Sequence, residues 1–200
     1  TSQTIKSPET LATMMAARAK QLADSINKAL HLNIETGEHS KLTSSYNQFK
    51  KGLMEDISPA EFADVYAQTI AYGMFAARYL DSTLPTFGRR QAAKLVPHSN
   101  PFLRQLFTEF GGNDVDEGIR WILDDLVHIF QFADVKAIMS KYGRAAQMND
   151  PVIHFYETFL AAYDPKLRKA RGVWYTPEPV VDFIVRAVDD ILKSDFGLKE

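Results

Sequence analysis

The chain has 200 residues, 46% of them hydrophobic and 24% charged, with a formal net charge of −2 and no cysteine. This composition is typical of a folded globular protein. It excludes global disorder, a general attraction to nucleic acid, and disulfide, thiolate-metal or cysteine-nucleophile chemistry. No apolar run approaches the roughly 20 residues that a membrane-spanning helix needs, so we expect a cytoplasmic protein with no membrane partner. The first residue is threonine rather than methionine, and we expect an excised piece of a longer protein.

Helix-start signals recur along the chain. Five pairs of a capping residue and a proline each precede an apolar-periodic segment: Ser7-Pro8, Ser58-Pro59, Asn100-Pro101, Asp150-Pro151 and Thr176-Pro177. The first side chain can accept a bond from an unpaired backbone N–H, and proline at the first helical position loses no hydrogen bond. The pattern predicts helices at 8–31, 39–55, 59–81, 88–95, 101–110, 115–131, 133–142, 151–163 and 177–193.

The helix at 59–81 is apolar around most of its circumference, which is typical of a helix at the centre of a bundle. No long alternating, β-branched stretch competes with the helical pattern. We therefore predict an all-α fold, an irregular multi-helix bundle of about eight or nine helices with 59–81 central. Asp64, Gln68 and Arg78 lie on this helix, and we expect neighbouring side chains or backbone to satisfy them.

Two histidines have neighbours at helical spacing. His128 follows Asp124 by four residues and Asp125 by three, so one of these carboxylates could face the imidazole. We interpret such a pair as a structural hydrogen bond at a helix surface, in preference to an acid–base pair. His154 and Glu157 have the i, i+3 spacing of metal-binding helical bundles, but such sites need the arrangement twice. We predict no catalytic residue and no metal site, and keep a metal or cofactor bundle around these three groups as an alternative.

Two basic patches are candidates for phosphate contact. One comprises Arg89, Arg90 and Lys94. The other is a connector with flanking aromatic residues, and its basic members are Lys166, Arg168, Lys169 and Arg171. A solvated basic face is the alternative for both, and for the connector the two interpretations are equally consistent with the sequence.

The segment KARGVWYTPEPVVDFIVRAVDDIL, at 169–192, has a more specific pattern. It resembles motif X of the γ-class DNA adenine-N6 methyltransferases, especially those fused to restriction endonucleases in one polypeptide. The segments at 150–170 and 58–79 resemble the lead-in and the helical spacer of the same enzymes. The matching motif residues are Arg171, Gly172, Tyr175, Thr176, Pro177, Val180, Val181, Phe183, Ile184 and Val185.

The resemblance implies a cofactor site for S-adenosylmethionine. Trp174 and Tyr175 would shape the pocket, Thr176 would offer its hydroxyl and backbone to the cofactor carboxylate, and Pro177 would open a helix that packs on a Rossmann-like sheet. The domain organisation would be a helical spacer at 1–163, a basic-aromatic linker at 164–176 and the first helix of a methyltransferase domain at 177–200.

The resemblance also implies a function for a larger parent protein. The parent would methylate adenine N6 in duplex DNA, and the chain would connect nuclease and methyltransferase domains of the same polypeptide. The Gly-rich cofactor loop and the Asn-Pro-Pro-Tyr loop of the family do not follow Pro177 here, so we expect the chain alone to be inactive. The SNPF segment at 99–102 precedes motif X, and we interpret it as a helix start. A stand-alone all-α protein-interaction module is the alternative.

Overall fold

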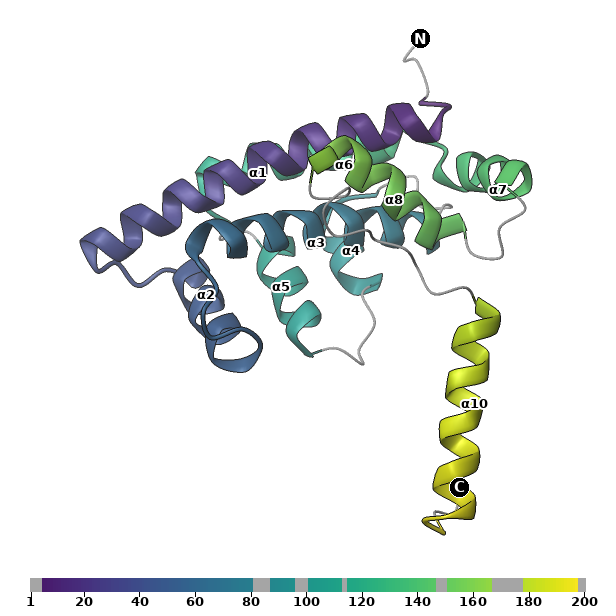
Figure 1. The fold of residues 1–200 in the computed structure, drawn as a ribbon. Helices are drawn as coiled ribbons and strands as arrows, with labels where there is room; N and C mark the ends of the chain where they lie inside the picture. The colour runs from purple at the N-terminus through teal and green to yellow at the C-terminus, as the bar shows by residue number, and fades with distance from the viewer. Residues whose placement is uncertain are drawn as a thin grey trace. The chain divides into compact units, whose positions relative to one another are not determined.

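The computed structural model describes residues 5–80, 87–95, 101–112, 115–146, 151–166 and 178–197. Within these ranges the regular secondary structure is helical (Figure 1). This confirms the all-α prediction. Ile5 and Ala133 also form an isolated β-bridge. The helices are α1 (Pro8–Thr36), α2 (Lys41–Gly52), α3 (Pro59–Leu80), α4 (Arg89–Leu95), α5 (Pro101–Gly111), α6 (Glu117–Phe132), α7 (Val135–Ala146), α8 (Pro151–Tyr163) and α10 (Glu178–Ser194).

The chain divides into two compact units, Thr1–Pro165 and Lys166–Glu200. The first unit contains α1 to α8, and α10 is the described helix of the second. None of the described helices is long and apolar enough to span a membrane.

The capping chemistry is visible at the helix starts that the structure describes. Ser7 Oγ accepts from the Thr10 amide at 3.1 Å. Ser58 and Glu61 form a reciprocal capping box, in which Ser58 Oγ accepts from the Glu61 amide at 3.2 Å and the Glu61 carboxylate accepts from the Ser58 amide at 3.0 Å. The other three predicted caps, at residues 100, 150 and 176, lie outside the described residues.

The predicted end of the first helix, at residue 31, was wrong. Helix α1 continues to Thr36, and Gly37 ends it with a φ of 70°, in the left-handed region where glycine carries no Cβ penalty. The Gly37 amide donates to the Asn33 carbonyl and closes the last turn.

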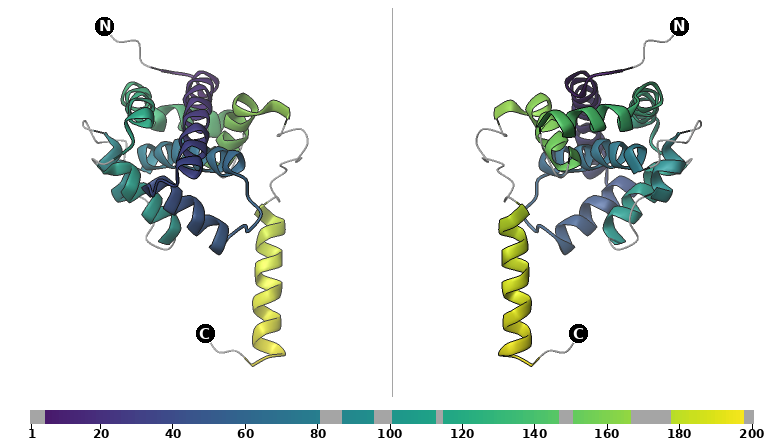
Figure 2. Two further views of the ribbon diagram at one scale, coloured as in Figure 1. Left: turned by 90° about the vertical axis from the view of Figure 1, so that its left-hand side faces the viewer. Right: turned by 90° about the vertical axis from the view of Figure 1, so that its right-hand side faces the viewer.

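Helices α1 and α3 form the centre of the first unit. Helix α3 packs along α1, and α1 also contacts α2, α6, α7 and α8. The centre of the bundle therefore consists of two helices, whereas the sequence predicted only the helix at 59–81 there. In Figure 2, α6 and α8 flank α1 on opposite sides. The core side chains of α3 include Phe62, Ile70, Met74 and Phe75, each exposed by at most 1%.

Aromatic side chains fill the space between α3 and α8. The rings of Phe75 and Phe155 stack with their centroids 4.4 Å apart. Tyr72 contacts Tyr156 edge-on at 4.9 Å, and its hydroxyl donates to the backbone carbonyl of Val152. Such ring pairs add about 0.5–1.5 kcal/mol each beyond the burial of their area, so this layer fixes α8 firmly on the bundle.

Helix α5 packs on α3 at a glycine. A Cβ at Gly73 would lie 2.3 Å from Cζ of Phe107, so the phenyl ring occupies the space that any larger residue would need. Phe107 is buried at this contact.

Candidate functional site

The last turn of α8, where the chain leaves the first unit, is held by a polar cluster. The Tyr163 hydroxyl donates to one carboxylate oxygen of Asp64 on α3. Gln68, one turn further along α3, donates to the other oxygen through Nε2 at 2.8 Å. Tyr163 is 4% exposed, so this network lies at the end of a buried side chain. We call Tyr163, Asp64, Gln68 and Lys20 the exit cluster.

The Tyr163 hydroxyl stays protonated and acts as a hydrogen-bond donor. Burial raises its pKa well above the ordinary value, and the hydrogen bond to Asp64 and the charges of Asp64, Asp24 and Asp164 raise it further. These causes all favour the protonated phenol, because an ionised oxygen would be poorly solvated and close to carboxylates. The hydroxyl therefore keeps its proton and its bond to Asp64 at neutral pH.

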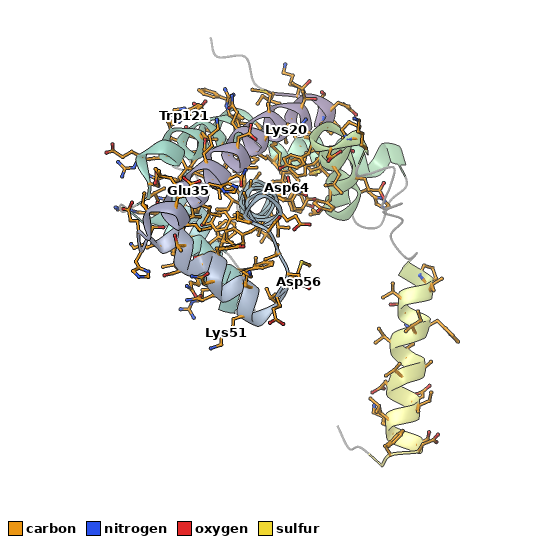
Figure 3. The ribbon with its side chains drawn as sticks, turned by 60° about the vertical axis from the view of Figure 1, so that its left-hand side comes forward. Lys20, Glu35, Lys51, Asp56, Asp64 and Trp121 are labelled. Carbon is orange, nitrogen blue, oxygen red and sulfur yellow. The ribbon has the colours of Figure 1, made fainter. Side chains whose placement is uncertain are left out.

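Lys20 of α1 completes the exit cluster. Its Nζ donates to the Ala162 carbonyl at 3.3 Å and lies 6.0 Å from the centroid of the Tyr163 ring. A cation near the end of a helix interacts favourably with the last carbonyl groups and with the negative end of the helix dipole. Figure 3 labels Lys20 on α1 and Asp64 on the adjacent α3. Both central helices therefore hold the last turn of α8.

The sequence-predicted site is only partly described. Lys166 is exposed at the first position of the second unit. The remaining predicted DNA-contact residues, Arg168, Lys169 and Arg171, lie outside the described residues, as do the predicted cofactor residues Trp174, Tyr175, Thr176 and Pro177.

Helix α10 has two chemically distinct faces. Val180, Ile184, Val188 and Ile191 follow helical spacing along one side, and each is between 44% and 51% exposed. The opposite face carries ion pairs at i, i+4, with 3.6 Å between Asp182 and Arg186 and 3.1 Å between Asp189 and Lys193. The second unit holds no other described helix that would cover the apolar face. Such a helix normally packs against another layer of structure.

The aspartates near His128 have other partners, so the predicted histidine–carboxylate bond was wrong. Asp124 Oδ1 lies 2.9 Å from Nε of Arg89, and Asp125 Oδ2 lies 3.0 Å from Nε of Arg18. The second contact is an ion pair by distance but lacks the alignment of a hydrogen bond. An arginine supplies a permanent positive charge and several N–H donors, which makes it a strong partner for a carboxylate.

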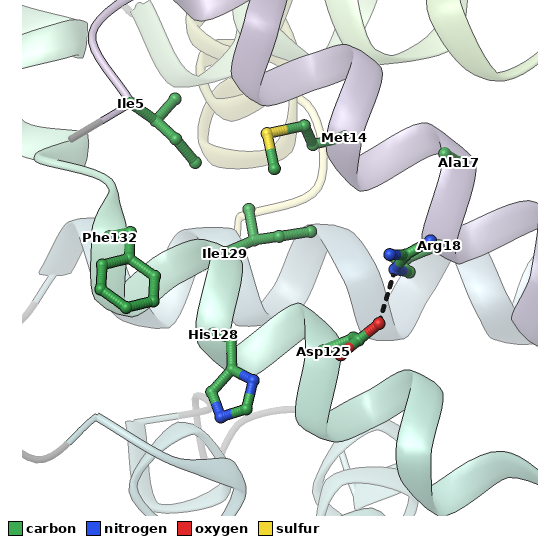
Figure 4. A pocket seen from close by; sticks show the side chains of 8 residues that line it. All are labelled: Ile5, Met14, Ala17, Arg18, Asp125, His128, Ile129 and Phe132. Atoms are coloured by element: carbon green, nitrogen blue, oxygen red, sulfur yellow. Dashed lines mark ion pairs between the residues drawn. The ribbon is translucent and has the colours of Figure 1, made fainter. Parts of the chain in front are cut away.

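His128 instead borders a cavity of about 480 Å³ between α1 and α6. Figure 4 shows Asp125 pointing toward Arg18 at one end, with Met14, Ile129 and Phe132 forming apolar walls. Met14 and Phe132 are 39% and 46% exposed, so the cavity is open along its rim.

Within the described residues, no group of three or more histidine, aspartate or glutamate side chains is placed to hold a metal ion. His128, on α6, and His154 and Glu157, on α8, are all described and do not form such a group. The alternative of a metal bundle around these three residues therefore has no support in the structure.

The first basic patch is partly structural. The Arg89 guanidinium pairs with Asp124 and donates through Nη1 to the Phe110 carbonyl at 3.1 Å, and its side chain is 17% exposed. It therefore links α4 to α5 and α6, and only Arg90 and Lys94 of this patch are exposed. Arg89 is therefore engaged within the fold, and phosphate contact by this patch stays a prediction.

The polar residues of α3 behave as predicted. Gln68 binds Asp64, and Arg78 Nε donates to the Phe130 carbonyl at 3.2 Å. The roles of Lys20 and Tyr163 in the exit cluster were not predicted from the sequence. Their one sequence signal is position: a tyrosine at the end of the helix directly before the basic segment.

No protein-family model, curated protein or solved structure gives a significant match to this chain.

Proposed function

We propose that this chain is the helical connector of a single-chain DNA adenine-N6 methyltransferase and restriction enzyme, and that its second unit supplies the first helix of the methyltransferase domain. The observation that carries the proposal is α10. The resemblance to motif X calls for a helix immediately after Thr176-Pro177, and α10 begins at Glu178. Its apolar face has the character of a helix that packs on a sheet, which is the role of this helix in the family.

In the parent protein, S-adenosylmethionine would supply the methyl group for adenine N6. By the resemblance, Trp174, Tyr175, Thr176 and Pro177 would contact the cofactor. In this proposal the 200-residue chain carries no catalytic residue of its own. Its contribution is to join the nuclease to the methyltransferase.

The exit cluster supports a positioning role for the first unit. Tyr163 and Lys20 hold the end of α8, and only Asp164 and Pro165 follow before the second unit begins at Lys166. A fixed exit point sets where on the surface of the first unit the connector begins. The basic residues that follow would contact the phosphates of DNA bound by the parent.

The phosphate contacts can be tested with this chain. We would measure binding to duplex DNA as a function of salt for the wild type and for a variant with Lys166, Arg168 and Lys169 each changed to glutamine. If all three contact phosphates, the slope of log K against log salt should become shallower by about 0.9 for each lost contact, or about 2.7 in total.

A matched control removes three exposed lysines from the first unit, Lys28, Lys51 and Lys136, and changes the net charge by the same amount. Its slope should stay close to the wild-type slope. Equal slopes for all three proteins would contradict a phosphate contact in the connector.

A stand-alone interaction module is the competing function, since an uncovered apolar helix face also suits protein binding. Full-length protein separates the two, because the proposed methyltransferase binds S-adenosylmethionine and an interaction module does not.

A further inference from the structure

A second cavity, of about 240 Å³, lies where the starts of α2 and α6 meet α3 and the end of α5. Its walls are mostly apolar, with Ile70 of α3, Phe110 of α5 and Leu123 of α6 among them. The polar side chains in this lining are Ser40, Lys41, Tyr66, Glu109 and Asp116. An apolar cavity with a few convergent polar groups is the usual form of a small-molecule site.

Tyr66 lines the cavity as a buried phenol with no hydrogen-bond partner among the described residues. The side chain is 6% exposed, and its ring contacts Phe62 with the centroids 5.4 Å apart. Burial raises the pKa of Tyr66, and the negative charge of the nearby Glu109 raises it further. The hydroxyl is therefore neutral. The hydroxyl makes no hydrogen bond to the described residues, so it is available to a polar group of a ligand in the cavity.

Glu109 supplies a negative charge to the same cavity. Its Oε2 accepts from the buried Ser45 hydroxyl at 2.7 Å, and its Oε1 accepts from Gln105 Nε2 at 3.0 Å. Both donors are neutral. No cation pairs with this carboxylate within the part of the chain that the structure describes, although the side chain is half-buried. The carboxylate therefore keeps lone pairs for a charged donor inside the cavity.

Asp116 and Lys41 also border the cavity. Asp116 caps α6, where its Oδ1 accepts from the Gly118 amide at 2.7 Å, and Lys41 is exposed and has contacts of its own. The group inside the cavity that lacks a charge partner is therefore Glu109, beside a phenol that lacks a hydrogen-bond partner.

We propose that this cavity binds a small organic ammonium ion with an apolar body. The ammonium group would donate to the Glu109 carboxylate and to the Tyr66 oxygen, and the apolar body would lie against Ile70, Phe110 and Leu123. At about 30 Å³ for each water-sized group, a cavity of about 240 Å³ suits a ligand of about eight heavy atoms. This site is independent of the proposed role in DNA methylation.

Benzylamine is a suitable probe, because it combines one ring with one ammonium group at neutral pH. We would measure its binding to the 200-residue chain by isothermal titration and by ligand-observed NMR, beside benzyl alcohol and benzoate. Benzylamine should bind with a dissociation constant on the order of millimolar, as expected for a fragment of this size. Benzyl alcohol should bind about tenfold more weakly, and benzoate not at all, because neither offers a cation to Glu109.

Two variants test the assignment of the residues. Glu109→Gln keeps an acceptor for Ser45 and should weaken benzylamine about tenfold or more. Tyr66→Phe keeps the ring and should weaken it by about threefold to tenfold. Glu35→Gln removes an exposed carboxylate from α1 and should leave binding unchanged. A cooperative thermal unfolding transition shows that each variant is folded. If Glu109→Gln does not fold, Tyr66→Phe is the decisive test.

A lysine side chain of another protein carries the same chemistry as a free amine. Nα-acetyl-lysine methylamide distinguishes the two sources: binding tighter than that of benzylamine assigns the cavity to a lysine side chain, and weaker binding assigns it to a free amine. The proposal is overturned if benzylamine does not bind, if benzyl alcohol binds as tightly, or if the folded Glu109→Gln and Tyr66→Phe variants bind like the wild type.

Discussion

Tyr163 donates a hydrogen bond to Asp64 across 99 positions of sequence, from the last turn of α8 to the first half of α3. This bond, and the contact of Lys20 with the Ala162 carbonyl, fix the point at which the chain leaves the helical bundle. The geometry of the exit therefore depends on the two central helices rather than on α8 alone.

Replacing Tyr163 with phenylalanine should lower the free energy of unfolding by roughly 1–3 kcal/mol, because Asp64 loses a buried donor. Urea unfolding measures the effect. Tyr79→Phe is the control, because the Tyr79 hydroxyl makes no hydrogen bond to the described residues; its effect should stay within about 0.5 kcal/mol. Equal losses in the two variants would contradict the role assigned to the exit cluster.

The same bond predicts a dependence of stability on alkaline pH. The pKa of Tyr163 in the folded chain is raised above its ordinary value of 10.0. Its contribution is therefore fully present below about pH 10 and is lost as the pH rises toward the folded-state pKa, because the unfolded chain releases the proton first. The stability difference between wild type and Tyr163→Phe should be constant from about pH 7 to 9 and should shrink above about 10. A difference that does not change up to about pH 11 would argue against a buried, protonated donor.

Gly73→Ala should destabilise the chain by about 1–3 kcal/mol, because the new methyl group meets the Phe107 ring at a distance that no Cβ tolerates. Adding Phe107→Leu should recover part of the loss. Gly52→Ala, where nothing lies within 4 Å of the new Cβ, should instead stabilise helix α2 by up to about 1 kcal/mol. A neutral Gly73→Ala would show that α5 does not pack on α3 as described.

Arg89→Gln should lower the free energy of unfolding by roughly 1–3 kcal/mol, since Asp124 and the Phe110 carbonyl both lose a charged donor. Lys94→Gln, an exposed change on the same helix, should cost less than about 0.5 kcal/mol. If Arg89→Gln is neutral for stability but weakens DNA binding, Arg89 belongs to a phosphate-binding patch after all.

In the full-length protein, Ile184→Asp should weaken the binding of S-adenosylmethionine by at least about tenfold, because it would bury an unpaired charge between α10 and the proposed sheet. Asp182→Asn, on the polar face of the same helix, should change binding by less than about twofold. Tolerance of Ile184→Asp would remove the argument that α10 packs on a methyltransferase core.

The elements of the fold were predictable because their signals are local. Ser7, Ser58 and the prolines after them start helices through bonds between residues three positions apart, and the apolar periodicity of 59–80 predicts burial without knowledge of the partner helices. Helix α1 continues past the predicted end at residue 31 because residues 32–36 contain no strong helix breaker, and Gly37 then ends it.

The polar contacts between helices were not predictable in the same way. Whether Asp124 binds His128 or Arg89, or whether Tyr163 reaches Asp64, depends on how helices pack that are distant in sequence. The cavity lined by Tyr66 and Glu109 has the same origin, because Tyr66 lies in the apolar stripe of α3 and only packing leaves its hydroxyl without a partner. The predicted cofactor residues, from Trp174 to Pro177, lie outside the described residues and stay a prediction.

Methyl transfer by the full-length protein tests the central claim most directly. Genomic DNA that lacks adenine methylation would be incubated with the protein and S-adenosylmethionine carrying a deuterated methyl group, and the nucleosides would be analysed by mass spectrometry. The proposed function predicts deuterated N6-methyladenine that requires the protein and disappears with Thr176→Ala. Absence of the labelled base with a folded full-length protein, or label on cytosine alone, would contradict it.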